Sequence, residues 1–158
     1  MNIKFRKISS VLFPKEIDNT FHGSKLLVYF FWGITVISLI RSLIHIFSPD
    51  GGAGSIAGLD LSVEGADGIV FAFALWGSSQ LLFSVLQALI AFRYRAWIPL
   101  MVVLLIFEML LRMLIGRLKP VTFAHTPPGA YGNLVFLLVG VVMLGLSFIR
   151  LEKSSDTG

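Results

Sequence analysis

The sequence predicts an all-α integral membrane protein, a four-helix bundle preceded by an N-terminal amphipathic surface helix. Of its 158 residues, 56% are hydrophobic and 14% are charged, whereas roughly 25% of an average soluble domain is charged. The mean hydropathy is +0.84. Four apolar runs are each long enough to cross a hydrocarbon core, which takes about 20 helical residues. A single domain of this composition is expected to lie mainly within a lipid bilayer.

Residues 1–24 are expected to form a cytoplasmic amphipathic segment. Four apolar residues in 1–13 recur at helical spacing, and they are Met1, Phe5, Ile8 and Leu12. Basic residues occupy other positions of this stretch, and Pro14 ends the pattern. An apolar face beside basic residues favours a helix lying on an anionic inner leaflet.

The four-span bundle is expected over residues 25–150, with spans at about 26–47, 68–92, 98–118 and 131–149. These spans should be helices, because backbone groups in lipid must form their hydrogen bonds internally. The second and third are joined by only residues 93–97, which predicts an antiparallel hairpin in contact along its length. The loop around 48–67 is rich in glycine, and prolines stiffen the loop at 119–130 into a shaped lid.

The orientation follows from the basic residues outside the spans. Nine of them lie in the N-terminal segment, the turn at 93–97 and the tail, whereas the other side has only Arg117 and Lys119. The first loop on that other side contains acidic residues and no lysine or arginine. Both termini, including a tail at 151–158, are therefore expected in the cytoplasm.

Polar residues form stripes on three of the spans. They recur every three or four positions, which places each stripe on one helical face. The stripes are Thr35, Ser38, Arg41, Ser42 and His45 on the first span, Gly77, Gln80, Ser84, Gln87 and Ala91 on the second, and Glu108, Arg112, Gly116 and Lys119 on the third. The fourth span offers small residues and no charge. These stripes are expected to face one another rather than lipid.

The buried charges carry a formal surplus of one positive charge. Glu108 and Arg112 lie one helical turn apart and can pair. No acidic residue among these buried charges is then left to pair with Arg41. Ionisable groups within a membrane normally pair, line a cavity or serve a function. In one interpretation these residues only lock the helices together. In the other, guanidinium groups bind the head of an anionic or carbonyl-bearing ligand in a pocket open to the outer side.

The expected ligand-binding residues are Arg41, His45, Ser38, Gln80, Glu108, Arg112, Lys119 and His125. Arg41 and Arg112 would hold the ligand's oxygen, and Glu108 would orient Arg112. Lys119 and the lid around His125 would guard the mouth. A lipid headgroup, a quinone and a small carboxylate all fit this chemistry.

Several other classes of function are disfavoured. The absence of cysteine excludes disulfides, thiolate metal sites and thiol nucleophiles. The net charge of +4 follows from topology, so no nucleic-acid partner is expected. His45 and His125 lack the spacing of a haem or zinc motif, so no metal site is predicted. Trp76, like the other tryptophan and tyrosine residues of the chain, is interpreted as an interfacial anchor or a packing residue.

One stretch resembles a known family. Residues 77–115 read GSSQLLFSVLQALIAFRYRAWIPLMVVLLIFEMLLRMLI and cover about a quarter of the chain. The glycine followed by a polar residue, the tight basic turn and the embedded acidic and basic pair resemble the central hairpin of DoxX-like small four-helix membrane proteins. Gln80 stands where that family is expected to have a glutamate. The resemblance implies a bacterial plasma-membrane protein, with some relatives linked to quinone-dependent electron transfer.

The sequence thus favours a non-enzymatic membrane protein that binds an anionic or quinone-like lipophilic ligand, as an accessory subunit or alone. One alternative is a purely structural or assembly subunit, in contact with a membrane protein partner or with further copies of itself. A second alternative is a quinone-linked redox enzyme. No cofactor is predicted, although a quinone or a lipid would fit the pocket.

Overall fold

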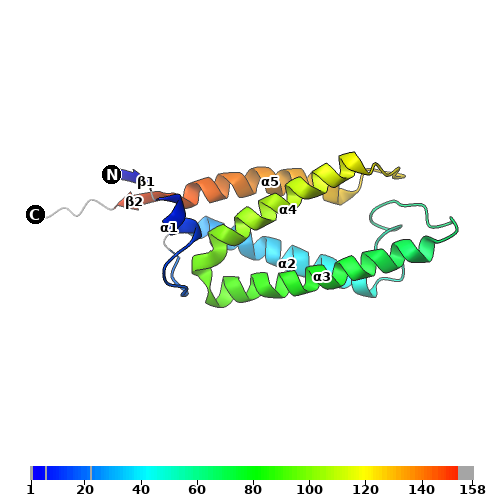
Figure 1. The fold of residues 1–158 in the computed structure, drawn as a ribbon, viewed down its shortest axis with the longest axis horizontal. Coiled ribbons are helices and arrows are strands. Elements are labelled where there is room, and N and C mark those ends of the chain that lie inside the picture. The colour runs from blue at the N-terminus through cyan, green and yellow to red at the C-terminus, as the bar shows by residue number, and fades with distance from the viewer. Residues whose placement is uncertain (1, 6, 22, 153–158) are drawn as a thin grey trace, which may run out of the picture.

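The computed structural model describes residues 2–5, 7–21 and 23–152, and it describes 2–5 and 149–152 through their backbone alone. The chain is dominated by four long helices that run along one axis (Figure 1). In chain order the elements are β1 (Asn2–Phe5), α1 (Ile8–Leu12), α2 (Lys25–Phe47), α3 (Ala66–Arg93), the 3₁₀ turn η1 (Arg95–Trp97), α4 (Ile98–Leu118), α5 (Pro128–Ser147) and β2 (Ile149–Glu152).

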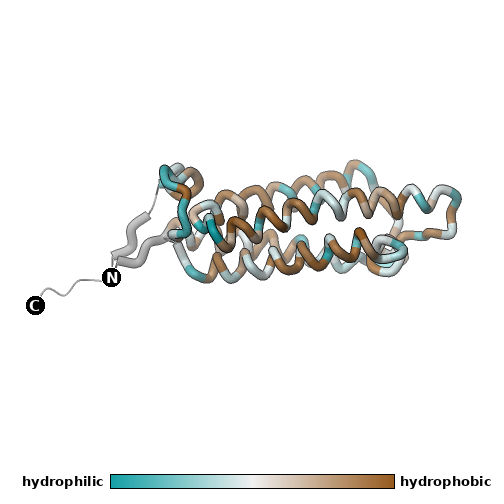
Figure 2. Tube along the Cα trace, turned by 90° about the horizontal axis from the view of Figure 1, so that it is seen from below, coloured by the Kyte–Doolittle hydropathy of each residue, from teal (hydrophilic) through white to brown (hydrophobic). Residues whose placement is uncertain are grey.

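The four predicted spans are confirmed as helices long and apolar enough to cross a membrane. Figure 2 shows hydrophobic residues along most of their length, whereas hydrophilic residues gather in the N-terminal segment and near the helix ends. The α5 helix begins three residues before the predicted boundary. Pro128 occupies its first turn, where a missing backbone N–H costs no hydrogen bond. This residue had been expected in the lid.

The four long helices extend between two ends of the molecule, the loop end and the terminal end. The loop end contains the connections 48–65 and 119–127, and the terminal end contains α1, β1 and β2 (Figure 1). The buried apolar cluster lies in the half of the helices nearer the terminal end. It consists of Leu27, Phe31, Ile34, Ile90, Ala91, Ile98, Met101, Val102 and Leu105. The apolar core therefore does not extend through the half of the helices nearer the loop end.

The predicted close hairpin of the second and third spans is wrong. The α3 helix packs chiefly along α2, whereas α4 packs chiefly against α5 and diverges from α3 beyond their connecting turn (Figure 1). Gly77 explains the preference of α3 for α2, because a Cβ atom there would lie only 2.6 Å from the Cβ of His45. A short connection fixes where two helices meet but not how closely they run afterwards.

The N-terminal segment also differs from the prediction. Among its described residues only Ile8–Leu12 is helical, and Asn2–Phe5 pairs instead with Ile149–Glu152 in an antiparallel two-stranded ladder. Short isolated helices are marginal, whereas the ladder supplies backbone partners to both terminal segments. The ladder also takes up residues 149–152, which were expected in the fourth span and the tail. Residues 153–158 of that tail lie outside the described residues.

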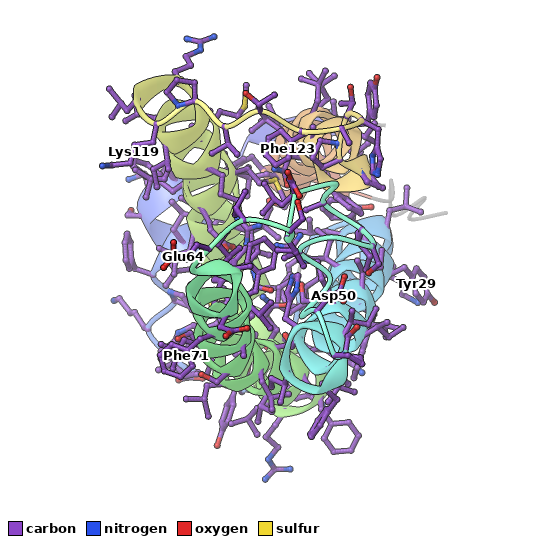
Figure 3. All side chains as sticks on the ribbon, turned by 90° about the vertical axis from the view of Figure 1, so that its right-hand side faces the viewer. Tyr29, Asp50, Glu64, Phe71, Lys119 and Phe123 are labelled. Carbon is purple, nitrogen blue, oxygen red and sulfur yellow. The ribbon has the colours of Figure 1, made fainter. Side chains whose placement is uncertain are left out.

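The glycine-rich loop is ordered around Asp50. Its carboxylate accepts hydrogen bonds from the backbone N–H groups of Gly52 (2.8 Å) and Ser55 (2.6 Å) and from the hydroxyl of Ser48 (2.8 Å). The backbone donors of Ser55 and Gly52 hold the pKa of Asp50 well below its ordinary value. Figure 3 views the molecule from the loop end and shows this loop, in which Asp50 and Glu64 are labelled.

The two loops at this end are joined by a backbone hydrogen bond, in which Ala124 N donates to Gly58 O at 2.8 Å. Gly58 has a left-handed backbone with φ of +71°, and His125 packs against it. Side chains on the periphery, such as Tyr29 and Phe71, point outward from the helices (Figure 3). The loop end is thus covered by a connected pair of loops above the helices.

Candidate functional site

All four long helices contribute to one cavity of about 280 Å³ in the half of the molecule nearer the loop end. It extends from the start of α5 and Ile56 of the first loop down to the edge of the apolar core. The lining residues are Ile34, Ile37, Ser38, Arg41, Ile56, Gln80, Phe83, Gln87, Leu105, Glu108, Met109, Arg112, Pro128, Gly129, Gly132, Asn133 and Phe136. Three of the polar stripes therefore face a shared space.

Gln80 lies at the centre of the polar end of this cavity. An amide oxygen is assigned by its donors, and here three surround one position. The oxygen of Gln80 accepts from Arg112 Nη2 at 2.7 Å, from Arg41 Nη2 at 3.0 Å and from Trp76 Nε1 at 3.2 Å. One neutral side chain thus connects α2, α3 and α4.

Arg112 also pairs with Glu108. Its Nη2 forms an ion pair with the Glu108 carboxylate, and its Nε donates to the same oxygen at 3.2 Å. Both side chains are partly exposed, at 23% for Arg112 and 38% for Glu108. Among the residues that the structure describes this is the one ion pair found, so Arg41 has no carboxylate partner there. The polar end of the cavity accordingly has a net positive charge.

Trp76 holds the charged groups together, a role that the sequence interpretation missed. The guanidinium carbons of Arg41 and Arg112 lie 4.8 Å and 4.9 Å from its ring centre. Such cation–π contacts stabilise a cation that has lost part of its hydration. A signal was present in the sequence, because Trp76 lies four residues before Gln80 and therefore on the same helical face.

His45 is placed behind Trp76 rather than in the cavity wall. Its ring stacks on Trp76 at 4.9 Å, and its Nδ1 lies 2.6 Å from the carbonyl oxygen of Gly51. A carbonyl only accepts, so Nδ1 carries the proton of this bond. Nε2 is then an acceptor, and it is buried without a hydrogen-bond partner. The histidine thus ties the first loop to the tryptophan.

Lys119 and His125 do not line the cavity. Lys119 lies at the exposed end of α4 and lines a separate hollow of about 650 Å³ between α3 and α4, together with Trp76, Glu108 and Arg112. Glu108 and Arg112 form part of the wall of both spaces. His125 packs on Gly58. The predicted lid contributes Pro128 and Gly129 to the cavity instead.

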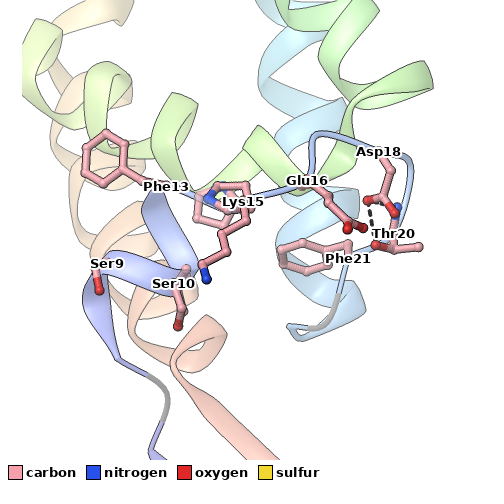
Figure 4. Close-up of a pocket in the computed structure, with 12 residues that line it drawn as sticks. Ser9, Ser10, Phe13, Lys15, Glu16, Asp18, Thr20 and Phe21 are labelled. Atoms are coloured by element: carbon pink, nitrogen blue, oxygen red, sulfur yellow. Dashed lines mark hydrogen bonds between the residues drawn. The ribbon is translucent and has the colours of Figure 1, made fainter.

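A third hollow, of about 560 Å³, lies at the terminal end between the N-terminal segment and the turn that joins α3 to α4 (Figure 4). Asp18 accepts hydrogen bonds from the hydroxyl and the backbone N–H of Thr20, and its backbone oxygen accepts one from Ala96 N at 3.3 Å. Lys15 and Glu16 line it as exposed side chains. Its charged residues are all exposed, whereas those of the cavity among the four helices are partly buried.

The main cavity offers hydrogen-bond donors to a bound molecule. Two guanidinium groups can donate to a carboxylate, a phosphate or a carbonyl oxygen, and apolar side chains continue below them. The residues that the structure describes contain no group of three or more histidine, cysteine, aspartate or glutamate side chains suited to a metal ion.

Comparison with known proteins returned no match. No protein-family model, no curated protein and no solved structure is significantly similar to this chain.

Proposed function

We propose that this protein spans a membrane as a four-helix bundle and binds a lipophilic ligand with an anionic or quinone-like head in the cavity among its helices. The observation that carries the proposal is the position of Arg41, which lines the cavity without a carboxylate partner among the described residues. Burying a cation without a counter-ion is costly, and an anionic head would supply the missing charge.

The rest of the cavity supports a lipophilic ligand. Below the polar end the wall is mostly apolar, and its apolar residues include Ile34, Phe83, Leu105, Met109 and Phe136. A ligand site of this type combines a mostly apolar lining with a few placed polar groups. Glu108 keeps Arg112 in position, and Gln80 orients both guanidinium groups through its amide oxygen. The ligand is bound and not transformed in this proposal.

We place the loop end on the outer side of a bacterial plasma membrane, with both termini in the cytoplasm. The distribution of basic residues supports this orientation. At the terminal end, Ile8 and Phe13 are each 67% exposed beside Lys7 and Lys15, which suits an N-terminal segment lying at the inner lipid surface. The resemblance to DoxX-like proteins supports the bacterial membrane assignment.

Native mass spectrometry of the protein, gently extracted from its membrane, tests the proposal. An adduct in stoichiometric amount is expected for the unaltered protein, and it should be lost in Arg41→Gln. Arg117→Gln serves as the matched control, since Arg117 lies on the exposed end of α4 outside the cavity. Far-UV circular dichroism confirms that both variants fold. An adduct that survives in Arg41→Gln would contradict the proposal.

The structural alternative has an observation in its favour, because Gln80 already satisfies donors from three helices. If the network serves only to lock the helices, the extracted protein will be bare, and Arg41→Gln will lower its stability or release a partner chain. The redox alternative requires a bound cofactor that absorbs light, so an absorption spectrum of the same sample without a cofactor band would refute it.

A further inference from the structure

The cavity contains a second polar group, Gln87, which the proposed function leaves unused. Gln87 is only 1% exposed, and its side-chain oxygen is buried without a hydrogen-bond partner. Buried polar side chains in native proteins nearly always have a partner. An unpartnered acceptor on a side chain that lines a cavity points to a donor that comes from outside the chain.

Gln87 lies at the opposite end of the cavity from the arginines. Seven residues, or two helical turns, separate Gln80 from Gln87 on α3, and the same interval separates Arg41 from Ile34 on α2. At 1.5 Å per residue this distance is about 10 Å along the helices. Gln80 and Gln87 on α3, like Arg41 and Ile34 on α2, all line the same cavity. The cavity therefore has a charged end and a neutral polar end.

Most side chains between these two ends are apolar, with Ser38 on α2 and Glu108 on α4 as polar exceptions. Ile37, Phe83 and Met109 surround the middle of the cavity, and none of them can donate or accept a hydrogen bond of ordinary strength. The cavity volume of about 280 Å³ falls just below the range of about 300–1,000 Å³ found for drug-sized ligands. A phospholipid with two acyl chains is too large for this space.

We propose that the ligand is a short single-chain carboxylate with a hydroxyl group at its far end. The carboxylate would bind Arg41 and Arg112, the chain would pack against the apolar middle, and the hydroxyl would donate to the side-chain oxygen of Gln87. This inference rests on the proposed function for its head group and adds the length of the ligand and its second polar contact. Gln87 becomes the residue that selects a hydroxylated chain over a plain one.

The test uses two soluble probes, octanoate and its terminally hydroxylated counterpart, with the full-length protein in lipid nanodiscs. Trp76 contacts both arginines, so its fluorescence reports binding in a Trp32→Phe and Trp97→Phe background. The hydroxylated probe is expected to bind about tenfold more tightly, the effect of one well-placed hydrogen bond to a buried group. Gln87→Met, which keeps the side chain's length and removes the acceptor, should abolish the difference.

A control variant separates this effect from a general disturbance of α3. Ser84 is buried on the same helix, donates to its own helix at Leu81 and does not line the cavity. Ser84→Ala should therefore keep the tenfold preference. Circular dichroism establishes that each variant is folded before titration, and Gln87→Leu is the substitute if Gln87→Met does not fold.

The outcomes distinguish the inference from the proposed function. If both probes bind equally to the unaltered protein and Arg41→Gln abolishes both, the arginine site stands and the role of Gln87 is refuted. If the preference persists in Gln87→Met, the hydroxyl contacts another group and the inference is again overturned. If neither probe binds and the extracted protein has no adduct, the proposed function fails and the inference fails with it.

Discussion

The contact between α2 and α3 at Gly77 yields the most direct structural prediction. A Cβ atom added at Gly77 would lie 2.6 Å from the Cβ of His45 and 3.2 Å from the backbone oxygen of Ser42. Neither atom is the flexible end of a side chain. Because carbon atoms in contact prefer a separation of about 3.5–4.0 Å, the two helices must move apart locally by roughly 1 Å in Gly77→Ala.

The expected cost can be isolated with a matched variant. Gly33 lies within α2, and a Cβ atom there meets no other atom within 4 Å. Both substitutions gain about the same helix propensity, up to about 1 kcal/mol relative to glycine, so this gain cancels in the comparison. The remaining difference is the overpacking at Gly77, and it should make Gly77→Ala about 1–3 kcal/mol less stable than Gly33→Ala.

Reversible unfolding in mixed micelles, followed by far-UV circular dichroism as the fraction of denaturing detergent rises, measures this difference. Trp76 fluorescence should also change in Gly77→Ala, because displacement of His45 disturbs its stack on the Trp76 ring. Equal stability of the two variants, with unchanged fluorescence, would refute the close packing of α2 on α3 at this point.

Two further changes test the loop and the charge balance of the cavity. Asp50→Asn should lower the free energy of unfolding by about 1 kcal/mol at neutral pH, since the charged acceptor is lost. The folded-state pKa of Asp50 is depressed, so its contribution is complete above 3.8, its ordinary pKa, and is lost as the pH falls through the folded value. Unfolding titrations should therefore show the two proteins converging in acid, and a constant difference would contradict the loop's hydrogen bonding. Glu108→Gln should lower stability by about 1–3 kcal/mol, because Arg112 loses its charged partner. The same change should strengthen octanoate binding to nanodisc-embedded protein, because removing the repulsion between two carboxylates outweighs the weaker positioning of Arg112. Weaker binding would show that the positioning of Arg112 is the larger effect.

The positions of the helices were predictable from the sequence because they depend on local properties. Long apolar runs and the need to satisfy backbone groups in lipid predicted α2, α3 and α4 to within a few residues. The spacing of polar residues also predicted that residues from three helices share a space. Arg41, Gln80 and Glu108 share one cavity wall, as the stripes indicated, because helical periodicity places such residues on one side.

Other features depended on how whole elements pack, and periodicity does not contain that information. The partner of α3 was decided by the close approach that Gly77 permits, which outweighed the short turn to α4. Likewise, β1 forms only because β2 returns to the same end of the molecule, a pairing between distant parts of the chain.

The roles of Trp76 and Gln87 were decided in the same way. The sequence predicted Gln87 as one member of a polar stripe and Trp76 as an anchor or packing residue, and the specific role of each depends on its surroundings in the folded protein. Trp76 lies against two arginines from α2 and α4, and Gln87 is left with an unpartnered oxygen. The sequence determined which residues share a face of each helix, because helical periodicity is local, and the rotation and separation of the helices decided which of those residues meet.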